Sequence, residues 1–265
     1  MNVPSGDNPW AYRLRRIVVV MASFAAMIGS GGCRQDQSAK RGKAVVVLVD
    51  RSASSRADRD LYRRGIERIL DILNPGDRIV AGWITGASAA DFREYLDEEL
   101  PPALPPMGVL DTASKYKARK QSSERKTEEQ RTKIRLGLER LLDRPSAATR
   151  TEIFASLRIV GQLLASEQRH TKLLVLMCDM VEDSAIANFE TARLDDGFID
   201  NEIARQKEQR ILPSLGGVRV YVVGARGEPL HRAALTEQFW RRYFAETGAQ
   251  LAPGAYSRAL PNIGE

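Results

Sequence analysis

The sequence predicts an α/β fold: a single doubly wound domain with a mainly parallel central sheet flanked by helices. Two apolar runs carry this prediction, Val45–Val49 and the run LLVLMC that follows Lys172 in the segment Lys172–Cys178. Strands that are buried on both faces of a parallel sheet appear as such continuous hydrophobic segments. Segments with helical spacing separate the strands, which is the pattern of βαβ units. With 265 residues, 43% of them hydrophobic, the chain is long enough to bury a substantial core.

The first predicted βαβ unit begins with the strand Val45–Val49. Apolar residues at helical spacing in Ala57–Leu73 predict an amphipathic helix. The sequence Asn74-Pro75-Gly76-Asp77 is a strong turn signal, and Arg78–Thr85 is expected to form the next strand. A right-handed crossover is expected for this unit.

The middle of the chain is rich in proline and charge. Phe92–Leu100 fits either a short edge strand or a helix, and four prolines between residues 101 and 106 exclude regular structure there. Ala113–Leu142 is expected to form a long helix with a highly charged first half, inside an insertion at about residues 106–145. Its Lys115–Lys126 segment fits a nucleic-acid or anionic-surface patch or a solvated helix face, and the intermingled Glu residues favour the solvated face.

The second half of the chain continues the alternation of helices and strands. The expected elements are a buried helix Ile153–Leu164, a strand Lys172–Cys178, a strand Val218–Val223 and a helix Leu235–Thr247. The aromatic residues of the last helix are interpreted as core packing. Together these elements place the domain at residues 44–252, with a C-terminal tail at 253–265.

The first 33 residues have the pattern of a secretory signal peptide. Basic residues precede the apolar run Ile17–Ile28, which is short for a membrane span, and small residues then lead to Cys33. This arrangement resembles the lipobox of bacterial lipoproteins, in which the Cys is lipidated; an ordinary signal peptide and an uncleaved anchor are the alternatives. Residues 34–43 are polar and predict a short tether. We therefore expect an exported protein of the bacterial cell envelope, anchored to a membrane and facing the periplasm or the exterior.

Composition excludes several classes of function. The net charge of +6 arises largely in the leader and in Lys115–Arg135, so no nucleic-acid partner is expected. Two Cys and two His give no zinc spacing. If Cys33 is acylated, Cys178 has no partner for a disulfide. The sequence contains neither a Gly-rich phosphate loop nor a Ser-His-Asp candidate, so no catalytic residue is assigned and the protein is predicted not to be an enzyme.

Polar side chains follow the first predicted strand at the place where a ligand would bind. Asp50 ends the strand, and Ser52 and Ser54 follow at alternating positions. In open α/β sheets, ligands lie beyond the carboxyl ends of the strands. Carboxylate and hydroxyl oxygens suit a hard cation such as Mg²⁺ or Ca²⁺. The alternative interpretation is a helix N-cap and a turn. A second acid, Asp179, ends the strand Lys172–Cys178.

Five segments, in this order, resemble the von Willebrand factor A domain: VVVLVDRSASS, NPGDRIVAGWIT, TEIFASL, KLLVLMCDMVEDS and GVRVYVVGARG. The resemblance implies a metal-ion-dependent adhesion site, whose ligands would be Asp50, Ser52 and Ser54 from the first loop, Thr151 from the second and Asp179 from the third. It also implies Mg²⁺, with Mn²⁺ or Ca²⁺ as alternatives, and a coordination position for an acidic side chain of a partner protein.

Some residues around these positions depart from the pattern of that family. Thr149 also precedes the helix of the second loop, and Thr151 is preferred because EIFASL follows it directly. Met180 stands where the family commonly has Gly, and the basic residues Arg51 and Arg150 flank the predicted ligands.

The expected function is a non-enzymatic, divalent-metal-dependent protein-binding module on the cell envelope. One alternative is a metal-dependent phosphohydrolase with Asp50 as nucleophile, although Ser52 occupies the second position of the Asp-x-Asp arrangement that such hydrolases use. The other alternative is a domain of the same fold with a degenerate metal site and a structural role.

Overall fold

The computed structural model describes residues 42–52, 54–88, 95–143, 150–225, 229–260 and 263. All described elements belong to one compact unit, residues 39–265. The predicted signal peptide, with the lipidation candidate Cys33, lies outside the described residues. So do nearly all of the predicted tether and Thr149.

Six strands form one sheet in the order β3-β2-β1-β4-β5-β6. Neighbouring strands pair in parallel, except that β3 runs antiparallel to β2. The strands are β1 (Lys43–Asp50), β2 (Arg78–Ile84), β3 (Leu96–Glu99), β4 (Thr171–Met177), β5 (Val218–Val223) and β6 (Gln250–Ser257). The predicted α/β class with a mainly parallel sheet is confirmed.

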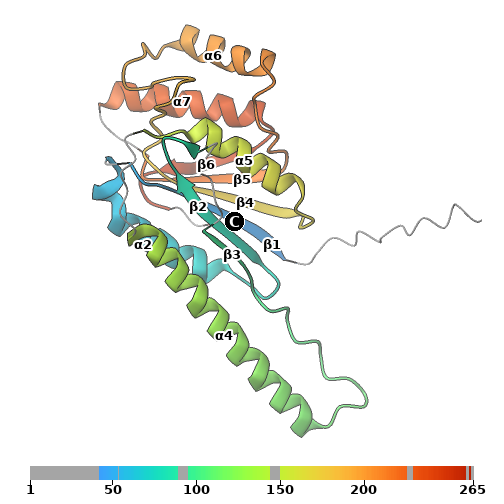
Figure 1. The fold of residues 1–265 in the computed structure, drawn as a ribbon. Coiled ribbons are helices and arrows are strands. Elements are labelled where there is room, and N and C mark those ends of the chain that lie inside the picture. The colour runs from blue at the N-terminus through green and yellow to red at the C-terminus, as the bar shows by residue number, and fades with distance from the viewer. Residues whose placement is uncertain are drawn as a thin grey trace, which may run out of the picture. The chain divides into compact units, whose positions relative to one another are not determined.

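Helices cover both faces of the sheet (Figure 1). They are the short 3₁₀ helix η1 (Ser54–Asp58), α2 (Arg59–Ile72), α4 (Ala113–Asp143), α5 (Ile153–Ala165), α6 (Asp196–Glu208) and α7 (Leu230–Glu246). Alternate residues of β1 enter two separate clusters: Val46 and Leu48 pack with α5, α6 and α7, whereas Val45 and Val47 pack with α2 and α4. Burial on both faces explains why β1 is an unbroken apolar run. Among the described helices, none combines the length and the apolar character required to cross a bilayer.

The aromatic residues of α7 belong to the core, as expected. Phe239, Trp240 and Tyr243 are fully buried, and their rings surround Phe154 of α5 with centroid separations of 5.8, 5.2 and 5.2 Å. This cluster packs α5 against α7. The helix itself begins at Leu230, earlier than the predicted Leu235.

The helix α6 was not predicted, because its inward face carries polar residues. Glu202 and Gln206 are buried beside Ile199 and Ile203. The amide of Gln206 donates to Glu202 Oε1 at 2.7 Å, and Arg205 pairs with the same carboxylate. Polar side chains that bond to one another thus occupy a buried helix face, although Gln206 Oε1 has no hydrogen-bond partner among the described residues. They interrupt the apolar period that would predict a helix.

The strand β6 was also not predicted, and it corrects the expected domain end at residue 252. β6 pairs with β5 through an irregularity between Val220 and Val222, and it contains Pro253 and Gly254. Proline is tolerated on an edge strand or at a bulge. The first part of the expected tail thus completes the sheet, and Leu260 beyond it is buried in the core.

Of the segment expected to form either a short edge strand or a helix, Leu96–Glu99 forms an edge strand, β3, and residues 92–94 lie outside the described residues. Its antiparallel register places Glu99 opposite Arg78, the first residue of β2. The chain therefore returns to the edge of the sheet at which the parallel strands begin, and the charged insertion starts from that edge. We call this the amino edge, and the opposite one the carboxyl edge.

Candidate functional site

The strand order reverses between β1 and β4. From β1 the chain proceeds through β2 to β3 on one side, and from β4 through β5 to β6 on the other. Ligands of open α/β sheets bind at this reversal, outside the carboxyl ends of the strands. Asp50 is the last residue of β1, and Asp179 follows β4 after Cys178. The two predicted carboxylates therefore lie at the carboxyl ends of the two neighbouring strands that flank the reversal.

The first loop is folded tightly by its own polar groups. Asp50 is 3% exposed; its Oδ1 accepts a hydrogen bond from Ser52 N at 2.7 Å and its Oδ2 accepts one from Ser52 Oγ at 2.8 Å. Ser55 Oγ donates to the carbonyl oxygens of Asp50 and Ser52 at 3.0 and 2.9 Å. The turn alternative is thus present in this loop. The cap of α2, however, is Asp58, which makes no side-chain cap bond. Ser54 begins η1, and its side chain lies outside the described part of the structure.

The second and third loops are joined by backbone hydrogen bonds. Thr151 N donates to Asp183 O at 3.2 Å, and Asp183 N donates to Thr151 O at 2.9 Å. Asp179 Oδ1 accepts from Val181 N at 3.0 Å, which turns the third loop back towards the second. Thr151 and Asp179 are each 5% exposed. The structure therefore holds the two loops that carry these predicted ligands side by side.

Glu182 connects the same two loops through its side chain. Its Oε2 accepts hydrogen bonds from Ile153 N at 2.7 Å and Phe154 N at 3.1 Å, the first two amides of α5. Burial raises the pKa of Glu182 to about 8; hydrogen bonds from Ser184 and from the two α5 amides oppose this rise. Its Oε1 is buried without a hydrogen-bond partner among the described residues. Sequence reasoning assigned no role to this residue, because an acid in a loop between Asp179 and Asp183 has the appearance of a surface residue.

Met180 occupies a backbone conformation that normally favours glycine. Its φ is +63°, in the left-handed region. The side chain is fully buried, the backbone N–H donates to Cys178 Sγ at 3.3 Å, and the carbonyl accepts from Trp240 Nε1 at 2.8 Å. Packing and hydrogen bonds thus keep Met180 in a backbone conformation that residues other than glycine rarely adopt. This explains how a large side chain is accommodated at a position where von Willebrand factor A domains commonly have Gly.

The two basic residues beside the predicted ligands have different environments. The guanidinium carbon of Arg51 lies 4.5 Å from the ring centroid of Trp83 on β2, a cation–π contact. Arg150 is exposed next to Thr151.

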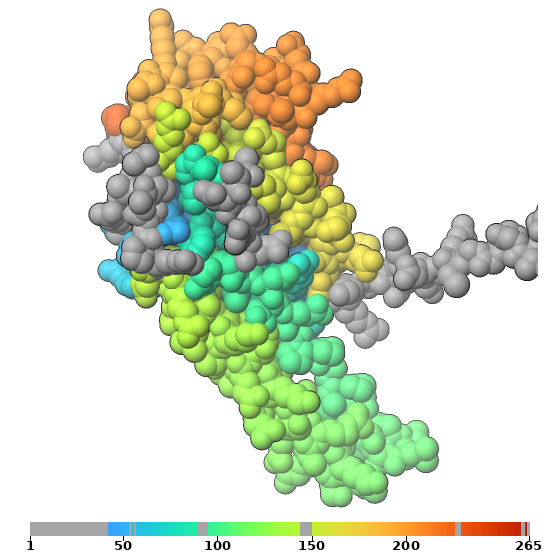
Figure 2. Space-filling model, viewed as in Figure 1, coloured from blue at the N-terminus to red at the C-terminus, as the bar shows by residue number. Residues whose placement is uncertain are grey.

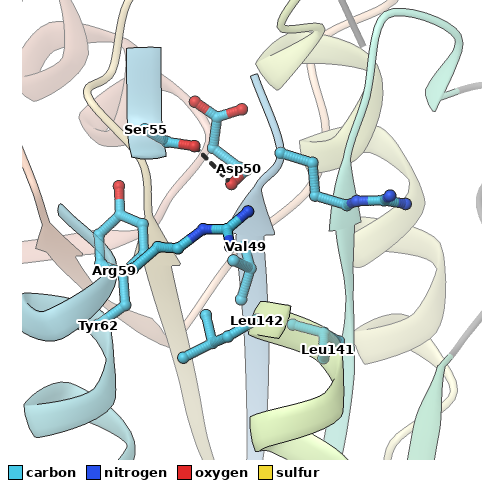
Figure 3. Close-up of a pocket in the computed structure, with 8 residues that line it drawn as sticks. Val49, Asp50, Ser55, Arg59, Tyr62, Leu141 and Leu142 are labelled. Atoms are coloured by element: carbon cyan, nitrogen blue, oxygen red, sulfur yellow. Dashed lines mark hydrogen bonds between the residues drawn. The ribbon is translucent and has the colours of Figure 1, made fainter. Parts of the chain in front are cut away.

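A small pocket opens beside the first loop (Figure 3). Asp50 and Ser55 lie at its upper end in the view, Leu141 and Leu142 of α4 lie at its base, and Tyr62 of α2 lines its side. Its cavity volume of ≈ 10 Å³ is about enough for the centre of one water molecule.

Both carboxylates act on the same buried groups. Burial is the main cause that raises the pKa of the Tyr62 hydroxyl and the pKa of the Cys178 thiol. The negative charges of Asp50 and Asp179 raise both pKa values further.

The donors fit a hard cation by their chemistry. All of them are oxygens, and those described are nearly buried, so a cation would replace lost solvation of the carboxylates. Only two are carboxylates, and within the described ranges no group of three or more His, Cys, Asp or Glu is arranged to hold a metal. A cation here would therefore depend on hydroxyl ligands as well, as the predicted set of ligands already requires.

Comparisons with known proteins identify no family for this chain. No family model matches it, and no curated protein matches it. Among solved structures, the PilB minor pilin from Streptococcus sanguinis is 13% identical, with 81% of this chain and 57% of that chain covered and a TM-score of 0.47. BatB from Bacteroides thetaiotaomicron is 14% identical, with 69% and 66% covered and a TM-score of 0.34. A von Willebrand factor type A protein from Catenulispora acidiphila is 14% identical, with 78% and 43% covered and a TM-score of 0.35. This chain spans less than two thirds of each of these proteins, and similarity at this level assigns no activity to it.

Proposed function

We propose that this protein is a von Willebrand factor A-type binding module that engages a protein partner through a divalent cation. One observation carries the proposal: Asp50 and Asp179 lie at the carboxyl ends of β1 and β4, the two strands at which the sheet order reverses. The order of the five sequence segments that resemble the family supports the same assignment.

In this proposal, Asp50, Ser52, Ser54, Thr151 and Asp179 hold the cation, with Mg²⁺ expected and Mn²⁺ or Ca²⁺ as alternatives. A bound divalent cation supplies a positive centre with room for an additional oxygen ligand. Ser52 orients the Asp50 carboxylate through its two hydrogen bonds. The backbone pair between Thr151 and Asp183 keeps the second loop next to the third.

The expected partner is a protein that presents an acidic side chain. The cation would accept that carboxylate, and the exposed Arg150 beside Thr151 adds positive charge at the rim of the site. The module acts by binding, without catalysis. We further propose that it works on the cell envelope, attached to a membrane through the N-terminal leader or a lipid on Cys33.

Thermal unfolding with and without metal tests the site. Saturating Mg²⁺ or Mn²⁺, at about 100 times the dissociation constant, stabilises the native state by about 2.7 kcal/mol and raises Tm by about 5–10 °C. Asp50→Ala and Asp179→Ala are expected to abolish this shift while the metal-free protein stays folded. Asp71→Ala, which removes an exposed acid of α2, is the matched control and keeps the shift.

A pull-down with and without chelator then tests the partner. Chelator-sensitive capture that Asp50→Ala eliminates supports the proposal. Absence of any metal-induced shift in Tm points instead to a degenerate site. Mg²⁺-dependent phosphatase turnover that disappears in Asp50→Asn would replace the binding function with hydrolysis.

A further inference from the structure

Val109 and Leu110 form the corner of a turn at the far end of the insertion. Asp111 N donates to Gly108 O at 3.0 Å and closes the turn around them. The Asp111 carboxylate accepts from Gly108 N at 2.9 Å and from Arg119 Nη1 at 3.0 and 3.1 Å. Turn corners usually carry Gly, Pro, Asn, Asp or Ser. Here a braced turn displays two large apolar side chains that are 103% and 97% exposed.

A projecting arm carries this turn away from the domain core. The helix α4 runs antiparallel to α2, as the pairs Arg63–Asp143 and Arg135–Glu67 show, and its first buried residue is Ile134. Residues 113–130 extend beyond α2 by roughly 27 Å at 1.5 Å per residue (Figure 1). The proline-rich residues 101–112 lead out to the turn, and Figure 2 shows this segment in green standing out from the neighbouring described residues.

The helical part of the arm next to the turn is cationic. Lys115, Lys117, Arg119 and Lys120 occupy its first turns, all four are exposed, and no acid occurs between residues 113 and 123. Arg119 pairs with Asp111, and Lys120 lies 3.9 Å from Glu124. Lys115 and Lys117 have no ion pair with any described residue. Exposed apolar side chains therefore stand next to uncompensated positive charge.

The arm leaves the domain from the amino edge of the sheet. Its root is Glu99, which pairs with the first residue of β2. Gly42, the first described residue, precedes β1 at the same edge. The candidate metal site lies at the carboxyl edge, so the two surfaces do not overlap.

We propose that the arm docks on the surface of an anionic lipid bilayer. Val109 and Leu110, with the half-exposed Met107, enter the boundary between headgroups and acyl chains, while Lys115 and Lys117 face the lipid phosphates. Apolar residues beside lysines are the combination that binds such interfaces. A nucleic acid would use the lysines, but its backbone offers nothing to the apolar corner. This proposal rests on the arm alone and does not depend on the metal site.

Fluorescence quenching by brominated lipid tests the docking in the full chain. Cys33→Ser prevents a second label, and Cys178 is buried. An environment-sensitive dye is attached at Val109→Cys or, as a control, at Leu230→Cys, an exposed apolar position that begins α7. Vesicles of brominated phosphatidylcholine are prepared with and without phosphatidylglycerol. Every variant carries the same leader with Cys33→Ser, so the difference between the two dye positions reports on the arm.

We expect strong quenching at residue 109 on vesicles that contain phosphatidylglycerol, and little at residue 230. With Lys115→Glu and Lys117→Glu together, about ten times more vesicles should be needed to reach the same quenching at residue 109. Arg64→Glu with Arg210→Glu, two exposed charges elsewhere, should leave it unchanged. Leu110→Asp should also weaken it, whereas Leu230→Asp should not.

Three outcomes would overturn the proposal. They are equal quenching at both dye positions, quenching at residue 109 that is independent of phosphatidylglycerol and of the lysines, and lysine-dependent retention of DNA or RNA without quenching at residue 109.

Discussion

Glu182 Oε2 lies 2.7 Å from the backbone nitrogen of Ile153 and accepts the first free N–H of α5. A fully buried acid therefore performs the task that a capping side chain usually performs, and it does so from a different loop. The contact adds a side-chain link to the two backbone hydrogen bonds between Thr151 and Asp183 that join the second and third loops.

The first prediction concerns the pH dependence of stability. The folded-state pKa of Glu182, about 8, lies above its ordinary value of 4.5, so the folded protein binds this proton more tightly than the unfolded chain. Its contribution to the free energy of unfolding is complete below pH 4.5 and is lost as the pH rises through 8, by at most about 5 kcal/mol. Glu182→Gln should remove this dependence. Urea unfolding between pH 5 and about 8.5 in chelator measures it.

The exposed acid Glu208 provides the control for this experiment. Glu208→Gln should leave the pH profile of the wild type intact. Parallel profiles for the wild type and Glu182→Gln would show that the carboxyl of Glu182 does not titrate with folding.

The second prediction concerns the left-handed backbone at Met180. Met180→Ala and Met180→Gly both lose the packing of the side chain beyond Cβ, but only glycine relieves the positive φ. The glycine variant should therefore be more stable than the alanine variant by about 1 kcal/mol. Chemical denaturation of the two variants measures the difference.

Met177, buried in β4, is the matched position in extended backbone. There the order should reverse, with Met177→Gly less stable than Met177→Ala, because glycine weakens a strand interior. The same order at both positions would contradict a backbone origin.

The third prediction concerns the buried guanidinium of Arg169 at the amino edge. It pairs with Glu167 Oε1 at 3.0 Å and donates from Nε and Nη2 to Gly76 O at 3.1 Å, which ties the turn before β2 to the segment before β4. Arg169→Met removes the guanidinium from Glu167 Oε1 and both donors from Gly76 O, while Arg78 still pairs with Glu167 Oε2 at 3.1 Å. It should therefore lower the free energy of unfolding by about 2–3 kcal/mol.

Arg169→Lys should not restore this stability, because one ammonium cannot reproduce the planar set of donors. Arg63→Met serves as the control, since Arg63 and its two acidic partners are exposed, and it should change stability little. Equal losses in Arg169→Met and Arg63→Met would contradict the prediction.

Burial decided which parts of the fold were predictable. β1 and β4 are apolar throughout because both of their faces are covered, and the acids that end them, Asp50 and Asp179, were therefore recognisable. The helix α6 was hidden by Glu202 and Gln206 on its inward face, and β6 by Pro253 within an irregular edge pairing.

Some residues of the candidate site could likewise be predicted from the sequence, and others could not. Strand ends mark Asp50, Ser52, Ser54 and Asp179 in the local sequence, and the family resemblance of the ordered segments adds Thr151; their role as metal ligands stays a prediction. The role of Glu182 depends on its contacts with Ile153 and Phe154, which precede it by 29 and 28 residues. No local sequence pattern indicates such a contact. The left-handed backbone of Met180 likewise receives a hydrogen bond from Trp240, 60 residues further on.

The position of β1 in the middle of the sheet also determines how the site loses its structure. β1 is paired on both sides, so its amides should be among the last to exchange with solvent, and Asp50 is attached to this slow part of the molecule. Thr151 lies outside the six strands, and two backbone hydrogen bonds together with the contact of Glu182 with α5 hold its loop to the third loop. The second loop would therefore move when the site opens and closes, while the first loop stays in place.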